Sequence, residues 1–154
     1  MPARASAVAV ALICLLTGAT AAAMSAEEFF RDGNRLFRDD LYWAALLRYG
    51  QAAEAGLDTP LLHYNTGVAH YKAGQYIRAG ESLQKAARSP KLRQLAHYNL
   101  GLSAYAAGDS DEALRWFRYA RDQGASEDIS NLARTAIARI QRGERAEDPV
   151  YQQK

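Results

Sequence analysis

The chain has 154 residues, enough for one domain with a modest core and too few for two well-packed ones. Hydrophobic residues make up 49% and charged residues 23%, which is the usage of a folded protein and excludes a disordered one. The formal net charge of +2 shows no large excess of cations, so we expect no nucleic-acid partner.

The first 23 residues have the layout of a secretory signal peptide. Arg4 supplies a positive start, residues 5–16 are apolar, and residues 17–23 are small. We predict cleavage after Ala23, with Ala21 and Ser25 as competing sites. The alternative is an uncleaved anchor helix, but the strongly apolar part is shorter than the roughly 20 residues that span a bilayer.

The single cysteine, Cys14, lies inside this segment. Its predecessor Ile13 is not small, as a lipid-attachment site would need, so we expect no lipid anchor. The mature chain would then contain no thiol and no disulfide. These features predict a periplasmic protein, with association with the outer membrane as the alternative. It would touch a membrane only through a partner, or if the signal is not cleaved.

Five columns of residues recur every 34 positions, without an insertion, over three copies. They are Gly33, Gly67 and Gly101; Ala45, Ala79 and Ala113; Ala52, Ala86 and Ala120; Tyr49, Leu83 and Phe117; and Phe37, Tyr71 and Tyr105. A glycine inside a helix costs up to about 1 kcal/mol relative to alanine. We therefore expect two helices to cross closely at each glycine, with the larger column filling the space one turn further on.

The pattern predicts seven helices, which in chain order span residues 26–38, 42–55, 60–73, 76–88, 91–107, 110–122 and 127–142. Pro60 suits the first turn of the third helix, with Asp58 or Thr59 as its cap. Pro90 and Ser89 suggest the same arrangement for the fifth helix.

Within each unit, a turn residue is expected between the two helices. Gly74 and Gly108 mark this turn in units two and three, and Asp40 takes the same place in unit one. Asp109 and Glu112 are spaced like a variant of the capping box before the sixth helix.

The seventh predicted helix is not a fourth repeat, because it lacks the glycine and alanine columns. It carries one apolar stripe of Ile129, Leu132, Ala133, Ala136, Ile137 and Ile140, and a polar side of Asp128, Asn131, Arg134, Arg139 and Gln141. One apolar and one wet face suit the cap of an open array. Residues 143–154 are polar and are predicted to form a tail.

The 34-residue period and the likeness of Tyr64-Asn65-Thr66-Gly67 to Tyr98-Asn99-Leu100-Gly101 resemble the tetratricopeptide repeat, a helix-turn-helix unit. The resemblance implies an all-α fold, a right-handed α-solenoid of three units at about 26–59, 60–93 and 94–125 with a capping helix at 127–142. The junction Ala55-Gly56-Leu57 followed by Leu62-His63-Tyr64-Asn65 also resembles the repeat subunit of bacterial Bat aerotolerance operons.

The first helix of each unit would line the concave side of such an array. We predict a peptide-binding groove of Phe30, Asn34, Phe37, Tyr64, Asn65, Val68, Tyr71, Lys72, Tyr98, Asn99, Leu102 and Tyr105, with Arg38 beside it. Two alternatives stay open. The tyrosines can instead pack between neighbouring units, and the asparagines can instead bond to an inter-helix turn.

Some tetratricopeptide domains clamp the C-terminal carboxylate of a chaperone with two asparagines and several basic residues. Asn34 and Asn65 match the amide positions, but the basic positions hold Phe30, Leu95 and Asn99. A desolvated carboxylate needs a compensating charge, so we expect no binding of such tails.

We expect no enzyme activity, no metal and no cofactor. The equivalent positions His63 and His97 correspond to Phe29 in unit one, which indicates core packing. The spacing of the histidines lacks the i, i+4 pair that would place two imidazoles on one metal. No glycine-rich phosphate loop and no activated nucleophile are readable.

The sequence thus predicts a periplasmic scaffold that binds a peptide or protein of the cell envelope. An alternative is an accessory module of a secretion or polysaccharide-export assembly at the outer membrane.

Overall fold

The structure is a computed structural model that describes residues 24–143. The predicted signal peptide, at 1–23, and residues 144–154 of the predicted tail lie outside the described residues. Between them the chain forms seven helices: α2 (Ala26–Arg38), α3 (Tyr42–Glu54), α4 (Pro60–Lys72), α5 (Tyr76–Ala86), α6 (Arg93–Ala106), α7 (Ser110–Asp122) and α8 (Glu127–Gln141). This confirms the predicted all-α array. None of these helices is long and apolar enough to cross a membrane.

The repeated glycines allow the two helices of each unit to cross closely. A methyl group built on Gly33 would lie 2.6 Å from the ring of Tyr49, and one on Gly101 would lie 2.6 Å from the ring of Phe117. Gly67 meets the Leu83 side chain in the same way, at 2.7 Å. Real Cβ atoms do not approach a neighbour this closely, so the predicted small-to-large fit is confirmed.

Turns and caps mostly follow the sequence. Asp40 has a φ of 59° at the position where Gly74 has 76° and Gly108 has 91°. Aspartate tolerates this left-handed conformation better than most residues do. Thr59 accepts a hydrogen bond from the backbone N–H of Leu62 at the start of α4. Asp109 does the same for Glu112.

The link between α5 and α6 differs from the prediction. Helix α5 ends at Ala86 rather than 88, and α6 begins at Arg93 rather than 91. Ser89 does not cap a helix, because residues 87–92 form a turn in which the N–H of Leu92 donates to the Ser89 carbonyl at 3.1 Å. Pro90 therefore lies in this turn and not in the first turn of a helix.

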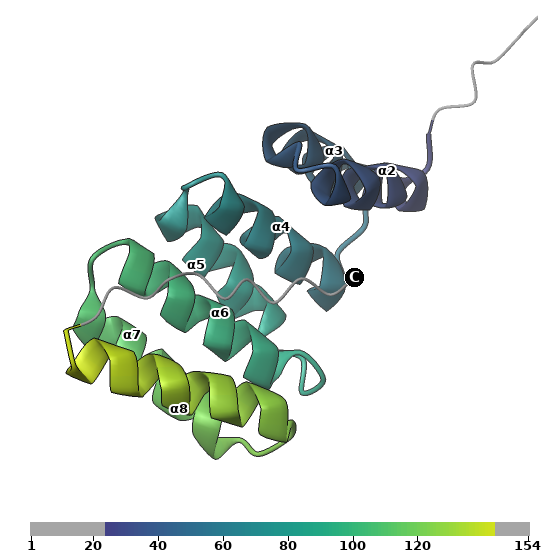
Figure 1. Cartoon of the computed structure of the whole chain (residues 1–154). Helices are drawn as coiled ribbons and strands as arrows, with labels where there is room; N and C mark the ends of the chain where they lie inside the picture. Colours follow the sequence, from purple (N-terminus) through teal and green to yellow (C-terminus); the bar gives the residue numbers. More distant parts are fainter. Residues whose placement is uncertain (1–23, 144–154) are drawn as a thin grey trace, which may run out of the picture.

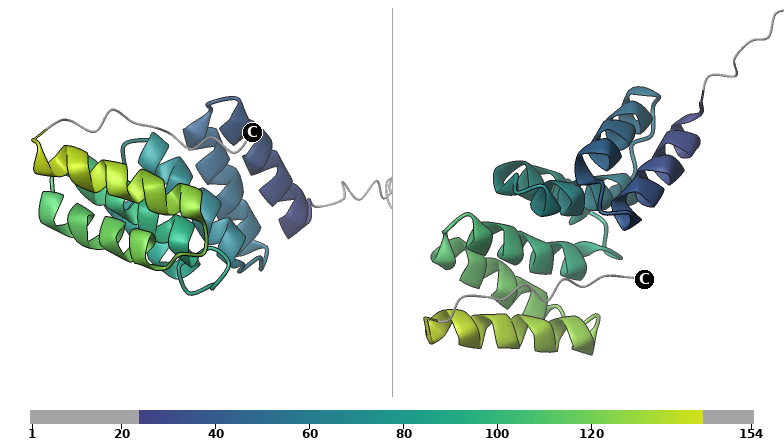
Figure 2. Two further views of the ribbon diagram at one scale, coloured as in Figure 1. Left: turned by 60° about the horizontal axis from the view of Figure 1, so that its bottom comes forward. Right: turned by 45° about the horizontal axis from the view of Figure 1, so that its top comes forward.

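Successive helix pairs stack into a curved array (Figures 1 and 2). Unit one is α2 with α3, unit two is α4 with α5, and unit three is α6 with α7; α8 packs on both helices of unit three. The buried residues form three clusters, one within unit one and at its junction with α4, one between units two and three, and one between unit three and α8. The core thus runs along the array in separate sections rather than around one centre.

Candidate binding surface

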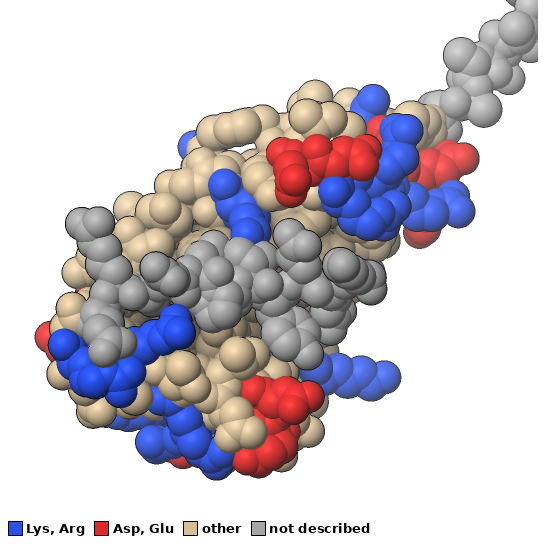
Figure 3. Space-filling view, viewed as in Figure 1, with Lys and Arg blue, Asp and Glu red and all other residues tan. Residues whose placement is uncertain are grey.

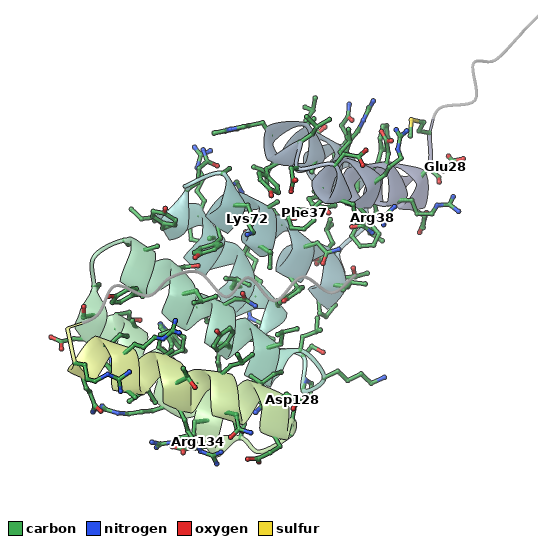
Figure 4. All side chains as sticks on the ribbon, viewed as in Figure 1. Glu28, Phe37, Arg38, Lys72, Asp128 and Arg134 are labelled. Atoms are coloured by element: carbon green, nitrogen blue, oxygen red, sulfur yellow. The ribbon has the colours of Figure 1, made fainter. Side chains whose placement is uncertain are left out.

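The first helices of the three units lie in one layer. Helix α2 contacts α4, α4 contacts α6, and α6 contacts α8, as Figure 1 shows. In Figure 4, Phe37 and Arg38 from the end of α2 and Lys72 from the end of α4 lie on the same side of the array. We call the side chains predicted for the groove, all on α2, α4 and α6, the first-helix surface.

Asparagines connect units one and two at this surface. The Asn34 side-chain oxygen accepts a hydrogen bond from the Tyr49 hydroxyl at 2.8 Å and another from the Asn65 amide at 2.7 Å. This oxygen is therefore already paired on both sides. Its partners are neither a ligand nor an inter-helix turn, but a buried ring of its own unit and the next unit. Burial raises the pKa of Tyr49 above its ordinary value.

A second amide connects units two and three. The Asn99 side chain donates to the Tyr64 hydroxyl at 3.0 Å and to the Leu95 carbonyl at 3.0 Å. Burial raises the pKa of Tyr64 to about 12, and the hydrogen bond from Asn99 opposes that rise. Tyr64 and Asn99 thus serve the contact between units.

In unit three, the capping helix covers part of the predicted groove. Tyr98 is 1% exposed and Leu102 is 6% exposed, and both lie in the cluster that includes Ala133 and Ile137 of α8. They face a neighbouring helix and not solvent. The surface that a ligand can reach therefore lies mainly on units one and two.

Three partly exposed rings of the first-helix surface pack against tyrosines of the second helices. The ring of Phe37 meets Tyr42 edge-on, with centroids 5.4 Å apart, and the ring of Tyr71 lies 5.8 Å from Tyr76. Phe30 packs at 5.8 Å against the buried Tyr49. Phe30, Phe37 and Tyr71 are each partly exposed, and each also packs against a buried cluster, so the fold fixes the position of these rings.

The described ion pairs of α2 are formed with nearby residues of α2 and α3. Asp32 of α2 pairs with Arg35 and, at 2.7 Å, with Arg48 of α3, and the hydrogen bond from Arg35 contributes most to lowering the pKa of this carboxyl. Figure 3 shows both signs side by side over α2. Along α8, acidic residues stand in the first turn and Arg139 in the last, which complements the helix dipole.

Core packing was predicted for His63 and His97, and this prediction is wrong because neither side chain is buried in the core. His63 is only partly buried and pairs with Asp58 at 2.7 Å, while His97 lies against the rings of Trp116 and Tyr119. Burial lowers the pKa of His97 and of His70. Within residues 24–143, no group of three or more His, Cys, Asp or Glu side chains is arranged to hold a metal ion.

Sequence reasoning missed a buried polar cluster between unit three and α8. The Gln94 amide nitrogen donates to the carbonyls of Ala120 and Ser126 and to the Ser130 hydroxyl, and its oxygen accepts from the Ser126 N–H at 2.6 Å. Gln94 is 4% exposed. The sequence gives only a weak indication that Gln94 is buried, because a glutamine at the start of a helix ordinarily faces water.

Two comparisons with known proteins agree with this architecture. Residues 30–93 and 64–128 match the family model described as tetratricopeptide repeat. The N-terminal domain of stress-induced protein-1 from C. elegans superposes with a TM-score of 0.62 at 15% identity, over 72% of this chain and 93% of that one. The TPR2AB domain of yeast Sti1, solved in complex with pHSP90, gives a TM-score of 0.64 at 19% identity over 77% of this chain. This chain spans about half, 48%, of that second chain.

Proposed function

The chain belongs to the tetratricopeptide repeat family, and we propose that it is a non-catalytic periplasmic scaffold that binds an extended peptide on the first-helix surface of units one and two. The observation that carries this proposal is the set of anchored, partly exposed rings of Phe30, Phe37 and Tyr71. Rings whose positions are already fixed by packing lose little conformational entropy when a ligand packs on them.

The partner is a peptide or protein of the cell envelope. Export rests on the sequence of residues 1–23, and the resemblance to the Bat repeat subunit remains a prediction from one junction. A yeast protein of similar fold was solved in complex with pHSP90. In this chain, however, the basic positions of a carboxylate clamp are occupied by Phe30, Leu95 and Asn99, which carry no positive charge. Moreover, Asn34 and Asn65 bond to each other. We therefore propose contact through aromatic faces and backbone hydrogen bonds rather than capture of a C-terminal carboxylate.

Site-specific photocrosslinking in cells tests the proposal. A benzoylphenylalanine placed at Phe37 or Val68 should give a discrete crosslinked product, because both positions belong to the partly exposed first-helix surface. The same probe at Tyr119, an exposed ring on α7, is the control and should give none. Equal crosslinking from all three positions, or none from Phe37 and Val68, would overturn the proposal.

Cell fractionation tests the location. The mature protein should appear in the osmotic-shock fraction, with its N-terminus near residue 24. Recovery from washed outer membranes instead would favour the accessory module of a secretion or polysaccharide-export assembly.

A further inference from the structure

The solvent-facing side of α3 is apolar, which the repeat pattern does not require. Trp43, Leu47 and Gly50 follow one another at i, i+4 and i+7 and so lie on one stripe of the helix. Trp43 and Leu47 are each 64% exposed, and Leu41 just before the helix is 53% exposed. Gly50 is also exposed.

The equivalent positions of the other two units show what water-facing helices of this array carry. In unit two they hold Ile77, Glu81 and Gln84, and in unit three they hold Asp111, Arg115 and Arg118. All six are exposed. Unit one alone among the three units has a tryptophan, a leucine and a glycine in this stripe. A contiguous apolar stripe on a helix surface marks an interaction site more often than single exposed residues do.

Gly50 provides a second, independent observation. It lies in the interior of α3, where glycine destabilises a helix relative to alanine. The crossing glycines meet a side chain, the turn glycines have positive φ, and a methyl group on Gly80 inside α5 would touch Leu100 at 3.9 Å, but a methyl group on Gly50 would meet nothing within 4 Å. The fold therefore gives no reason for this glycine. A second backbone approaching this face closely would give one, because only glycine leaves room for it.

The charges around the stripe decide what kind of partner fits. Asp40 precedes α3, where its carboxylate accepts a hydrogen bond from the Tyr42 hydroxyl, and Glu54 stands four residues after Gly50 on the same stripe; both are exposed. The one cation of α3, Arg48, is paired with Asp32 of α2. The apolar stripe is thus acidic at both ends. A twofold pairing of two copies through this face would bring Asp40 of one copy towards Glu54 of the other, and an anionic membrane would be repelled.

We propose that the outer face of α3 docks a single apolar α-helix that carries lysine or arginine at both ends. The Trp43 ring and Leu47 form the apolar contact, Gly50 allows close approach of the two backbones, and Asp40 and Glu54 receive the cationic ends. This surface is on the second helix of unit one. It is therefore separate from the first-helix surface and stands whether or not that surface binds a peptide.

Peptide binding to the full mature chain tests the proposal directly. The background variant is Trp116→Phe, which leaves Trp43 as the single tryptophan of the two in the sequence. The probe is a synthetic 18-residue helix with a leucine and alanine stripe and two lysines at each end; its matched control carries glutamates in place of the lysines. The lysine-ended peptide should shift Trp43 emission to shorter wavelength in a saturable way. At low salt, its dissociation constant should be lower than that of the control by a factor of about ten or more.

Three variants then locate the contact. Leu47→Glu and Gly50→Gln introduce the residues that unit two has at the same positions, and each should weaken binding about tenfold or more. Gly50→Gln should also raise the melting temperature, which separates loss of binding from loss of fold. Ile77, which is 79% exposed, holds the position on α5 that is equivalent to Trp43. Ile77→Ala removes this exposed apolar side chain and should leave binding unchanged.

Four results of the peptide titrations would overturn the proposal. They are no saturable shift with the lysine-ended peptide, equal binding of both peptides, unchanged binding by Gly50→Gln, and an equal loss from Ile77→Ala. A shift of Trp43 emission by phosphatidylglycerol vesicles without peptide would assign the face to a membrane, which also contradicts it.

Discussion

Unit one and unit three carry the same repeat columns but are buried to very different extents. Helix α2 buries Gly33 alone, whereas the equivalent helix α6 buries seven residues, among them Tyr98 and Leu102. Unit three is packed between unit two and α8, while within residues 24–143 unit one contacts unit two on one side. The shared columns therefore determine how the two helices of a unit cross. The neighbours determine which other side chains remain available to a ligand.

The test with the largest expected effect replaces the equivalent core residue of units one and three by alanine. Phe117→Ala should lower the free energy of unfolding by about 3–5 kcal/mol, because its 1% exposed ring packs in the cluster shared with α8. Tyr49→Ala in unit one should lie at the low end of that range, since fewer helices close around the cavity. Urea denaturation followed by circular dichroism measures both. Equal losses would show that the capping helix adds nothing at this position.

A residue swap between the units sharpens the comparison. Leu102→Asn gives unit three the residue of unit one and should cost about 2–4 kcal/mol, because the amide is buried against α8 without a partner. The reverse change, Asn34→Leu, should cost about 1–2 kcal/mol by leaving the Tyr49 hydroxyl without its acceptor. The same urea titrations apply. A neutral Leu102→Asn would contradict the burial of this position by α8.

The junction between units two and three predicts a loss of stability at high pH. Because burial raises the pKa of Tyr64 to about 12, above the value of about 10 in an unfolded chain, the folded state favours the protonated ring. This contribution is fully present below pH 10 and is lost as the pH rises towards 12, by about 2 kcal/mol. Tyr64→Phe should flatten that part of the profile, although Tyr49 will contribute in the same direction. An identical slope in both proteins would contradict the assignment.

The smallest test compares two helix caps. Ser25 and Glu28 form a reciprocal capping box at the start of α2, and Asp109 caps α7. Ser25→Ala and Asp109→Ala should each cost about 1 kcal/mol. Hydrogen exchange should differ, however, because α2 packs mainly on α3, whereas α7 packs on both α6 and α8. Faster exchange confined to α2 is expected for Ser25→Ala, and faster exchange across both α7 and α8 for Asp109→Ala.

Much of the fold follows from local patterns in the sequence. The glycine columns predict the helix crossings, and Asp40 and Thr59 predict a turn and a cap, because these features depend on residues close together in the chain. The prediction of a capped helix start at Pro90 was wrong for a related reason. Serine before proline is compatible with both a capped helix and a turn, and residues 87–92 adopt the turn.

Less of the candidate surface could be predicted. The burial of Tyr98 depends on where α8 docks, and the role of Asn34 depends on contacts 15 and 31 residues away. Gln94 likewise bonds to residues 26–36 positions further along the chain. A spacing rule reports which residues share a helix face. It does not report which other helix covers that face.

The cross-unit bonds of Asn34 with Asn65 and of Asn99 with Tyr64 have a consequence for the thermodynamics of association. They hold the spacing of α2, α4 and α6 before any partner arrives, so the loss of conformational entropy at this surface accompanies folding. A partner then has to order only itself. Calorimetry should therefore give a heat-capacity change set by the apolar area covered, without the additional change that coupled folding of the scaffold would produce.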